Sequence, residues 1–267
     1  MTLKELLNQN FEVLSESIND KPLFKAIVTA GSPGGGKSFI TKIMFSTSKW
    51  LNAPNNVTVI NSDVFFELGL EKAGLPKVIS LDDKELYKAQ MEVRDNAKRL
   101  TSHKLGHAIN NMNCLLIDGT GANFEKTKAQ IEGLRSMGYD VSMIFINTPL
   151  EAAQARNARR ERSLDPKIID ALWNRVNDNL PKYKALLGDD LYVVDNQENE
   201  KDSEEDKAFK DKLYKLGQKI LEKPLQNPLG RAIIETLKAT GGRYITDLPD
   251  KEERKKTVDG IEKTTAR

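Results

Sequence analysis

The sequence has few of the residues that build disulfide or metal frameworks. It contains one cysteine, Cys114, and two histidines among 267 residues. One thiol cannot form an intramolecular disulfide, and its place in the apolar run 114–117 favours a buried core side chain. His103 and His107 are four residues apart, but Lys104 stands where the helical motif of zinc proteases requires glutamate. The sequence therefore argues against a disulfide scaffold and against a zinc protease.

Long apolar runs and a strong net charge are also lacking. No stretch reaches the roughly eighteen apolar residues of a membrane span, and residues 1–20 contain no apolar block of the signal-peptide type. The 41 lysines and arginines nearly balance 39 acidic residues, which gives a net charge of +2. General binding to nucleic acid or to a membrane is therefore not predicted, and a cytoplasmic protein is expected.

Short apolar segments alternate with longer segments of helical periodicity. Buried strands are expected at 24–30, 57–60, 114–117, 141–146 and 191–194. Helices are expected at 39–50, 84–110, 125–137, 149–162 and 167–187. This order predicts the α/β class, with a sheet of about five parallel strands covered by helices on both faces in a three-layer fold.

The pattern divides the chain into a core and smaller flanking parts. We expect an N-terminal helix packed on the core within 1–22, and a core domain over 23–196 that includes a lid around 149–166. An acidic linker is expected at 197–208, with an exposed helix start as the alternative, then a helical C-terminal extension at 209–246 and a flexible tail at 247–267.

A phosphate-binding motif, the Walker A motif or P-loop, follows the first expected strand and precedes a helix. The pattern G-x-x-x-x-G-K-[ST] is met by Gly31, Gly36, Lys37 and Ser38. Glycines let main-chain amides turn toward phosphate oxygens, while Lys37 would reach the β- and γ-phosphates and Ser38 would ligate Mg²⁺. The motif predicts a P-loop NTPase-type fold and an ATP site formed by Gly31, Ser32, Pro33, Gly34, Gly35, Gly36, Lys37, Ser38 and Phe39.

Two carboxylates follow the next two expected strands. Asp63 would face a phosphate acceptor at the carboxyl end of the sheet, where it could act as a general base. The alternative is that Asp63 or Ser62 caps a helix. Asp118 ends an apolar strand in the manner of a Walker B acid, which would hold Mg²⁺; the alternative is that it begins the turn 119–121.

An arginine-rich segment follows the fourth expected strand. Residues 148–151 form a capping box with Pro149 at the first helical position, so a helix is predicted to begin there. On that helix Arg156 and Arg160 stand four apart, on one face. They would contact ATP and stabilise the charge that spreads over phosphate oxygens, whereas the alternative is a solvated basic surface.

Residues 24–196 resemble the zeta-toxin and polynucleotide-kinase-like group of P-loop kinases. The resemblance rests on the motifs at 31–38, 61–65, 115–120 and 156–160. It implies that Asp63 is the general base, that Arg160 stabilises the transferring phosphoryl group and that Arg156 assists ATP binding. Zeta toxins of this group phosphorylate a nucleotide sugar, and other members act on polynucleotide 5′-hydroxyl ends.

Two classes of function remain at this point. The first is an ATP- and Mg²⁺-dependent kinase that acts on a hydroxyl of a small molecule, a sugar nucleotide or a nucleic acid. The second is a P-loop switch or partner-binding protein with slow ATPase activity. In either class, the C-terminal extension could dock a protein partner.

Overall fold

The computed structural model describes residues 22–45, 57–79, 82–160, 164–196 and 203–239. Several expectations fall wholly or partly outside these residues. They concern the N-terminal helix within 1–22, the end of the first core helix near 50, lid residues 161–163, part of the acidic linker at 197–202, and the chain from 240 to 267.

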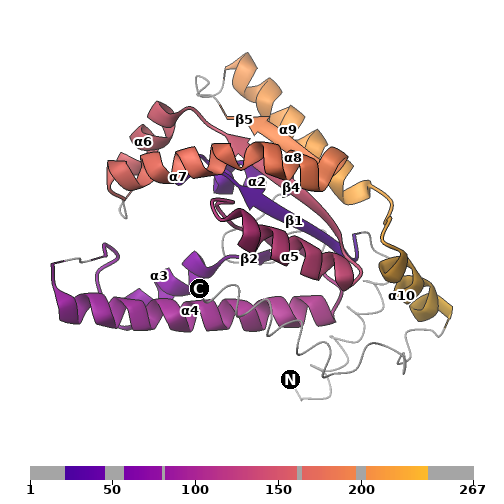
Figure 1. Cartoon of the computed structure of the whole chain (residues 1–267), viewed down its shortest axis with the longest axis horizontal. Coiled ribbons are helices and arrows are strands. Elements are labelled where there is room, and N and C mark those ends of the chain that lie inside the picture. Colours follow the sequence, from indigo (N-terminus) through magenta and orange to yellow (C-terminus); the bar gives the residue numbers. More distant parts are fainter. Residues whose placement is uncertain (1–21, 46–56, 80–81, 161–163, 197–202, 240–267) are drawn as a thin grey trace.

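Five parallel strands form one sheet in the order β2-β3-β1-β4-β5 (Figure 1). The strands are β1 (Lys25–Ala30), β2 (Val57–Ile60), β3 (Cys114–Ile117), β4 (Asp140–Asn147) and β5 (Leu191–Asp195). The central strand β1 pairs Ala26 with Leu115 on one side and with Val141 on the other. The prediction of five parallel strands is confirmed, with each strand within a residue or two of its expected limits.

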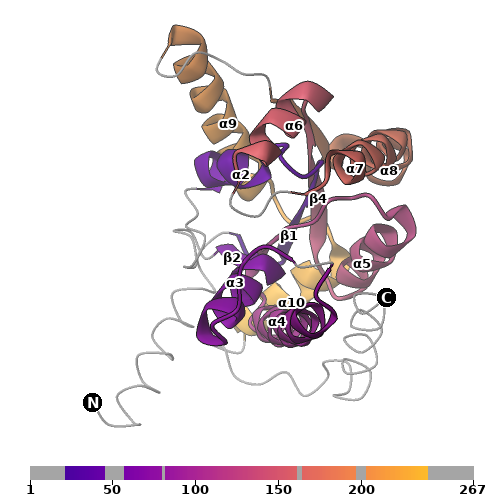
Figure 2. The same ribbon diagram turned by 90° about the vertical axis from the view of Figure 1, so that its left-hand side faces the viewer.

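Helices cover both faces of the sheet, which confirms the three-layer fold (Figure 2). One face packs against α2 (Lys37–Phe45) and α9 (Glu204–Glu222). The other packs against α5 (Phe124–Ser136), α7 (Pro166–Asp178), α8 (Leu180–Leu187), the end of α4 (Lys84–Asn110) and α10 (Pro228–Ala239). Because side chains alternate along a strand, Ile27 and Val28 enter opposite layers.

Two helical projections leave the carboxyl ends of the strands. The helix α3 (Ser62–Lys72) follows β2 and packs on α4 through Phe66, Leu70 and Ala97. The short α6 (Leu150–Ala158) follows β4 and packs on α7. In Figure 1 both α6 and α3 lie at the left of the view, with α6 above and α3 below. None of the helices in the described ranges is both long and apolar enough to cross a bilayer.

The structure differs from the expected helices in several places. The segment 167–187 forms two helices, α7 and α8, which meet at Asn179. The side-chain amide of Asn179 donates to the carbonyl oxygens of Gly121 and Ala122, both at 3.1 Å. The helix α3 was not expected, and α9 begins at Glu204, so the end of the acidic segment is a helix start and not a linker. Asn179 therefore joins the α7–α8 corner to the loop after β3.

Much of α9 belongs to the core. Its residues Leu213, Ile220 and Leu221 share one buried cluster with Ile40 and Met44 of α2. Gly217 lies so close to the Met44 carbonyl that a Cβ at this position would collide with main chain. The close approach of α9 to α2 therefore depends on glycine at this crossing.

Candidate phosphate-binding site

The loop between β1 and α2 has a conformation that requires glycine. Gly34 and Gly36 have φ angles of 78° and 84°, in the left-handed region. A Cβ at Gly34 would collide with the carbonyl of Ala153, and one at Gly36 would collide with the side-chain amide of Asn196. Both backbone conformation and space therefore restrict these two positions.

Two buried side chains hold one carbonyl of this loop. The oxygen of Gly35 accepts hydrogen bonds from Thr148 Oγ1 at 2.9 Å and from Asn196 Nδ2 at 2.8 Å. Thr148 follows β4 and Asn196 follows β5, so the clamp ties the loop to two strand ends. Since a trans peptide directs its C=O and N–H in opposite directions, the amide of Gly36 is turned away from the clamp. Amides so turned are the groups that can surround a phosphate.

The prediction of a Thr148 capping box is wrong. Pro149 occupies the N-cap position of α6 and makes no side-chain capping bond. The Thr148 hydroxyl is instead used by the P-loop carbonyl, and the Thr148 main-chain oxygen accepts a bond from Trp173 Nε1 at 2.8 Å. The Thr148 side chain therefore bonds to the P-loop and does not cap α6.

The Lys37 ammonium lies over the loop and donates to the carbonyl oxygens of Gly31 at 2.9 Å and Ser32 at 3.1 Å. Burial lowers the pKa of Lys37; Asp118 opposes this shift, Arg160 adds to it and Asp63 opposes it. The folded chain thus brings the charges of Asp63, Asp118 and Arg160 within interaction range of Lys37. A partly desolvated cation in this position fits an anionic ligand.

Asp118 follows β3 and accepts hydrogen bonds from side chains at the ends of β1 and β2, the two strands that flank β3. Its Oδ1 accepts a hydrogen bond from Thr29 Oγ1, and its Oδ2 accepts one from Asn61 Nδ2, both at 2.9 Å. The Thr29 hydroxyl in turn accepts a bond from the amide of Gly119 at 3.1 Å. Both carboxylate oxygens of Asp118 therefore have a fixed orientation at the carboxyl edge of the sheet.

Asp63 lies in the first turn of α3 and is partly buried. The cap of this helix is Asn61, whose Oδ1 accepts a bond from the amide of Asp63 at 2.8 Å. The alternative reading, in which Asp63 or Ser62 caps the helix, is therefore wrong. Asp63 remains a candidate base at the edge where Lys37 and Asp118 also lie.

The two predicted arginines do not share one helical face. Arg156 lies on α6, and its Nη1 is 3.4 Å from the point that a Cβ on Gly36 would occupy. Arg160 is exposed and lies beyond the end of α6 at Ala158. The helix ends early because Asn157 makes paired bonds with Leu164, donating to its carbonyl at 2.8 Å and accepting from its amide at 3.1 Å.

The described residues fit a nucleotide and its metal in the manner of a P-loop. Lys37 and Arg156 supply positive charge beside the loop, and Ser38 and Asp118 carry oxygen atoms of the kind that could hold Mg²⁺. Within the described ranges, no three acidic, histidine or cysteine side chains gather as a ready metal cage. Mg²⁺ commonly binds through one or two protein oxygens together with phosphates and water, so such a cage is not needed.

Four polar residues of this site were not predicted from the sequence to belong to it. Asn61, Thr148 and Asn196 directly follow strand-forming segments, whereas Thr29 lies inside β1. Polar side chains just after apolar strands of a parallel sheet could have marked the first three, because strand carboxyl ends meet at one edge.

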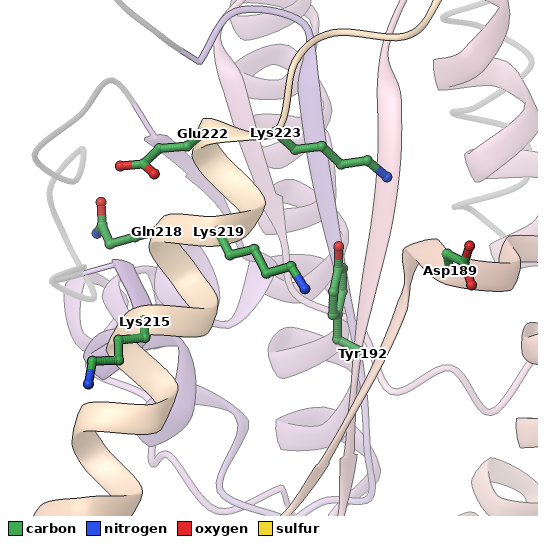
Figure 3. Close-up of a pocket in the computed structure, with 7 residues that line it drawn as sticks. All are labelled: Asp189, Tyr192, Lys215, Gln218, Lys219, Glu222 and Lys223. Carbon is green, nitrogen blue, oxygen red and sulfur yellow. The ribbon is translucent and has the colours of Figure 1, made fainter.

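A separate hollow of about 830 Å³ lies between α9 and β5 (Figure 3). Its lining includes Tyr192, Lys219 and Lys223, and the ammonium of Lys219 points toward Tyr192. None of the site residues expected from the sequence lines it. The hollow is therefore distinct from the P-loop.

Comparison with known families decides the identity of the chain. A family model described as Zeta toxin matches residues 13–207. The chain belongs to the zeta-toxin family. A search of curated proteins finds no match.

Solved structures share the fold of this zeta-toxin family chain. A candidate kinase from Chloroflexus aurantiacus J-10-fl has a TM-score of 0.50 and 14% identity, covering 75% of this chain and 100% of that chain. The PezAT toxin-antitoxin structure from Streptococcus pneumoniae gives 0.44 and 18%, covering 84% and 97%. Shikimate kinase from Acinetobacter baumannii, in complex with shikimate, gives 0.41 and 17%, covering 79% and 99%.

These similarities differ in what they show. At 14% identity the Chloroflexus structure shows the fold alone, and the two lower TM-scores carry no argument. The family match and the five-stranded sheet together place this zeta-toxin family chain among the P-loop kinases. The acceptor is a separate question.

Proposed function

We propose that the chain is an ATP- and Mg²⁺-dependent kinase that transfers the γ-phosphoryl group of ATP to a hydroxyl. The observation that carries this proposal is the shaped P-loop, whose Gly35 carbonyl is held by Thr148 and Asn196. The acceptor is a small molecule, a sugar nucleotide or a nucleic acid.

The P-loop residues bind and orient the nucleotide. Main-chain amides around Gly34 and Gly36 surround the phosphates, and Lys37 exchanges its bonds with loop carbonyls for bonds to phosphate oxygens. Ser38 and Asp118 hold the metal, which neutralises charge on the phosphates when it is bound. The fixed carboxylate of Asp118 needs no reorientation for this role.

Asp63 and the arginines act on the reacting groups. Asp63 accepts the proton of the acceptor hydroxyl as the oxygen attacks the γ-phosphorus, and the bond to the leaving oxygen of ADP breaks. Arg156 approaches the phosphates from α6, and Arg160 from the segment after it. Planar guanidinium groups suit charge that spreads over several phosphate oxygens.

The direct test is transfer of labelled γ-phosphate to a panel of hydroxyl acceptors, with native chain and with Asp63→Asn. Asp211→Asn is a matched control, because Asp211 is exposed on α9 and pairs with Lys215. We expect Asp63→Asn to lower kcat by about 10²-fold or more, and the control to leave it unchanged. Full transfer by Asp63→Asn would remove Asp63 from the mechanism.

The same assay separates the kinase from a nucleotide switch. A switch would release labelled phosphate to water, slowly or only with a partner, and would transfer none to any acceptor. Failure of the native chain to bind ATP in the presence of Mg²⁺, measured by calorimetry, would overturn both readings.

A further inference from the structure

One side chain, Asn61, touches both predicted acidic positions of the site. Its Nδ2 donates to Asp118 Oδ2 at 2.9 Å, and its Oδ1 accepts from the main-chain amide of Asp63 at 2.8 Å. Asn61 stands between β2 and α3, so its amide links the start of α3 to the end of β3.

Only an amide fits both bonds at this position. Asparagine, aspartate and serine all accept the N-cap bond well. An ionised aspartate has no proton to donate to Asp118, and a serine has one short hydroxyl in place of two separate polar ends. By contrast Asn123, which caps α5 by accepting from Lys126, uses its amide only for the cap. Capping alone therefore does not explain why residue 61 is an asparagine.

We propose that Asn61 is a positioning residue that sets the place of Asp63 relative to Asp118. The inference rests on the proposed function, in which Asp63 takes a proton and Asp118 holds Mg²⁺. Together with Thr29, Asn61 fixes both oxygens of Asp118, and through the cap it fixes the first turn of the helix that carries Asp63. Outer residues that orient metal-binding carboxylates contribute about 10- to 100-fold to activity or metal affinity.

The competing explanation is that Asn61 only caps α3. The variants Asn61→Ser and Asn61→Asp separate the two roles, because both keep a capping oxygen and both lose the donor to Asp118. Asn61→Ala loses both functions. Asn123→Ala removes a cap of the same residue type on α5 and serves as the control for capping alone.

Steady-state kinetics and thermal unfolding of the full chain give the first test. We expect Asn61→Ser to unfold near the native temperature while kcat falls about 10- to 100-fold. Asn61→Asp should lose at least as much kcat and should also unfold at a lower temperature, because it sets a second carboxylate against Asp118. The KM for MgATP should rise only by the factor that the Mg²⁺-dependent gain in affinity loses, since the P-loop bonds to the nucleotide are untouched. Asn123→Ala should lower the unfolding temperature and leave kcat unchanged. Native kcat in Asn61→Ser and Asn61→Asp would overturn the proposal, as would a loss of kcat no larger than that of Asn123→Ala.

A binding measurement provides a readout that does not depend on turnover. The affinity for ATP is measured by calorimetry with and without Mg²⁺, in native chain and in Asn61→Ser. We expect equal affinities without Mg²⁺ and a smaller gain from Mg²⁺ in the variant. An equal gain would overturn the proposed link to Asp118. A native chain that binds MgATP and phosphorylates nothing would defeat the proposed function, while this comparison would still decide the role of Asn61.

Discussion

The indole Nε1 of Trp173 donates a hydrogen bond to the main-chain oxygen of Thr148, 2.8 Å away. The hydroxyl of the same threonine donates to Gly35 in the P-loop. Trp173 lies on α7, so Thr148 joins this helix to the loop that would hold the phosphates. Rearrangement of the P-loop on binding ATP should therefore reach Trp173.

This link predicts a fluorescence response. Trp50 and Trp173 are the two tryptophans of the chain, so Trp50→Phe leaves Trp173 as the single emitter. We expect MgATP to change its emission in this background. Adding Thr148→Val removes the hydroxyl donor but keeps the main-chain acceptor, and the response should become smaller. An undiminished response would show that Thr148 does not couple the two elements.

Asn196 should contribute to nucleotide affinity through the shape of the P-loop. Asn196→Ala removes the 2.8 Å bond to the Gly35 carbonyl, and we expect a loss of about 1 kcal/mol in ATP binding, or roughly fivefold in Kd. Asn196→Asp should bind more weakly still, because a carboxylate would face a carbonyl and the phosphates. The measurement is calorimetric titration with MgATP.

Asn147→Ala is the control for this prediction. Asn147 donates to Asp195 on the exposed end of β5, and the bond from the Asn196 amide goes to its main-chain oxygen. The substitution therefore leaves the P-loop clamp in place. Equal losses in Asn147→Ala and Asn196→Ala would point to a general disturbance of the strand ends.

The sequence predicted those features that are fixed by contacts within one segment, and it missed those that depend on contacts between distant segments. The bounds of α4 and the five strands could be predicted because apolar periodicity and turn residues lie within each segment. The early end of α6 could not, because it depends on the bonds between Asn157 and Leu164 across the loop. The clamp by Asn196 depends on residues 161 positions apart and on the strand order, which no local pattern encodes.

The candidate site shows the same division. The P-loop follows from one short motif, whereas the relation of Asn61 to Asp118 exists only because β2 and β3 are neighbours. The roles of Asp63, Asp118, Arg156 and Arg160 stay predictions. What the fold adds is their common location at the carboxyl edge of the sheet.

Cys114 should be unreactive in the folded chain. Burial raises the pKa of its thiol to about 12, with Lys25 opposing the shift, so roughly one thiol in 10,000 is ionised at pH 8. We expect a disulfide reagent to modify the chain only under unfolding conditions. Rapid labelling of native chain at pH 8 would contradict the buried position.

The same shift predicts a dependence of stability on pH. The folded chain holds the thiol proton more tightly than the unfolded chain, whose thiol has the ordinary pKa of 9.0. Its contribution is therefore complete below pH 9 and is lost as the pH rises toward about 12. Denaturant unfolding should show a steeper alkaline decline for the native chain than for Cys114→Ala.

Tyr139 offers a test of packing against hydrogen bonding. Its hydroxyl is buried, and no described residue forms a hydrogen bond with it. Tyr139→Phe removes an unsatisfied polar group, so we expect the free energy of unfolding to stay equal or to rise by up to about 1 kcal/mol. Tyr183→Phe is the matched comparison, because the Tyr183 hydroxyl donates to Gly121 at 2.8 Å. That variant should lose about 1 kcal/mol, as measured by denaturant unfolding.

The packing of α9 on α2 bears on where the smallest independently stable fragment ends. The zeta-toxin match stops at residue 207, whereas α9 continues to Glu222 and buries Leu213 and Leu221 beside Met44. A polypeptide trimmed to the family limit would leave this apolar strip of α2 uncovered, and such strips promote aggregation. Evolutionary boundary and folding boundary thus fall at different residues, and shortened versions are expected to stay monodisperse in size-exclusion chromatography only when they reach past α9.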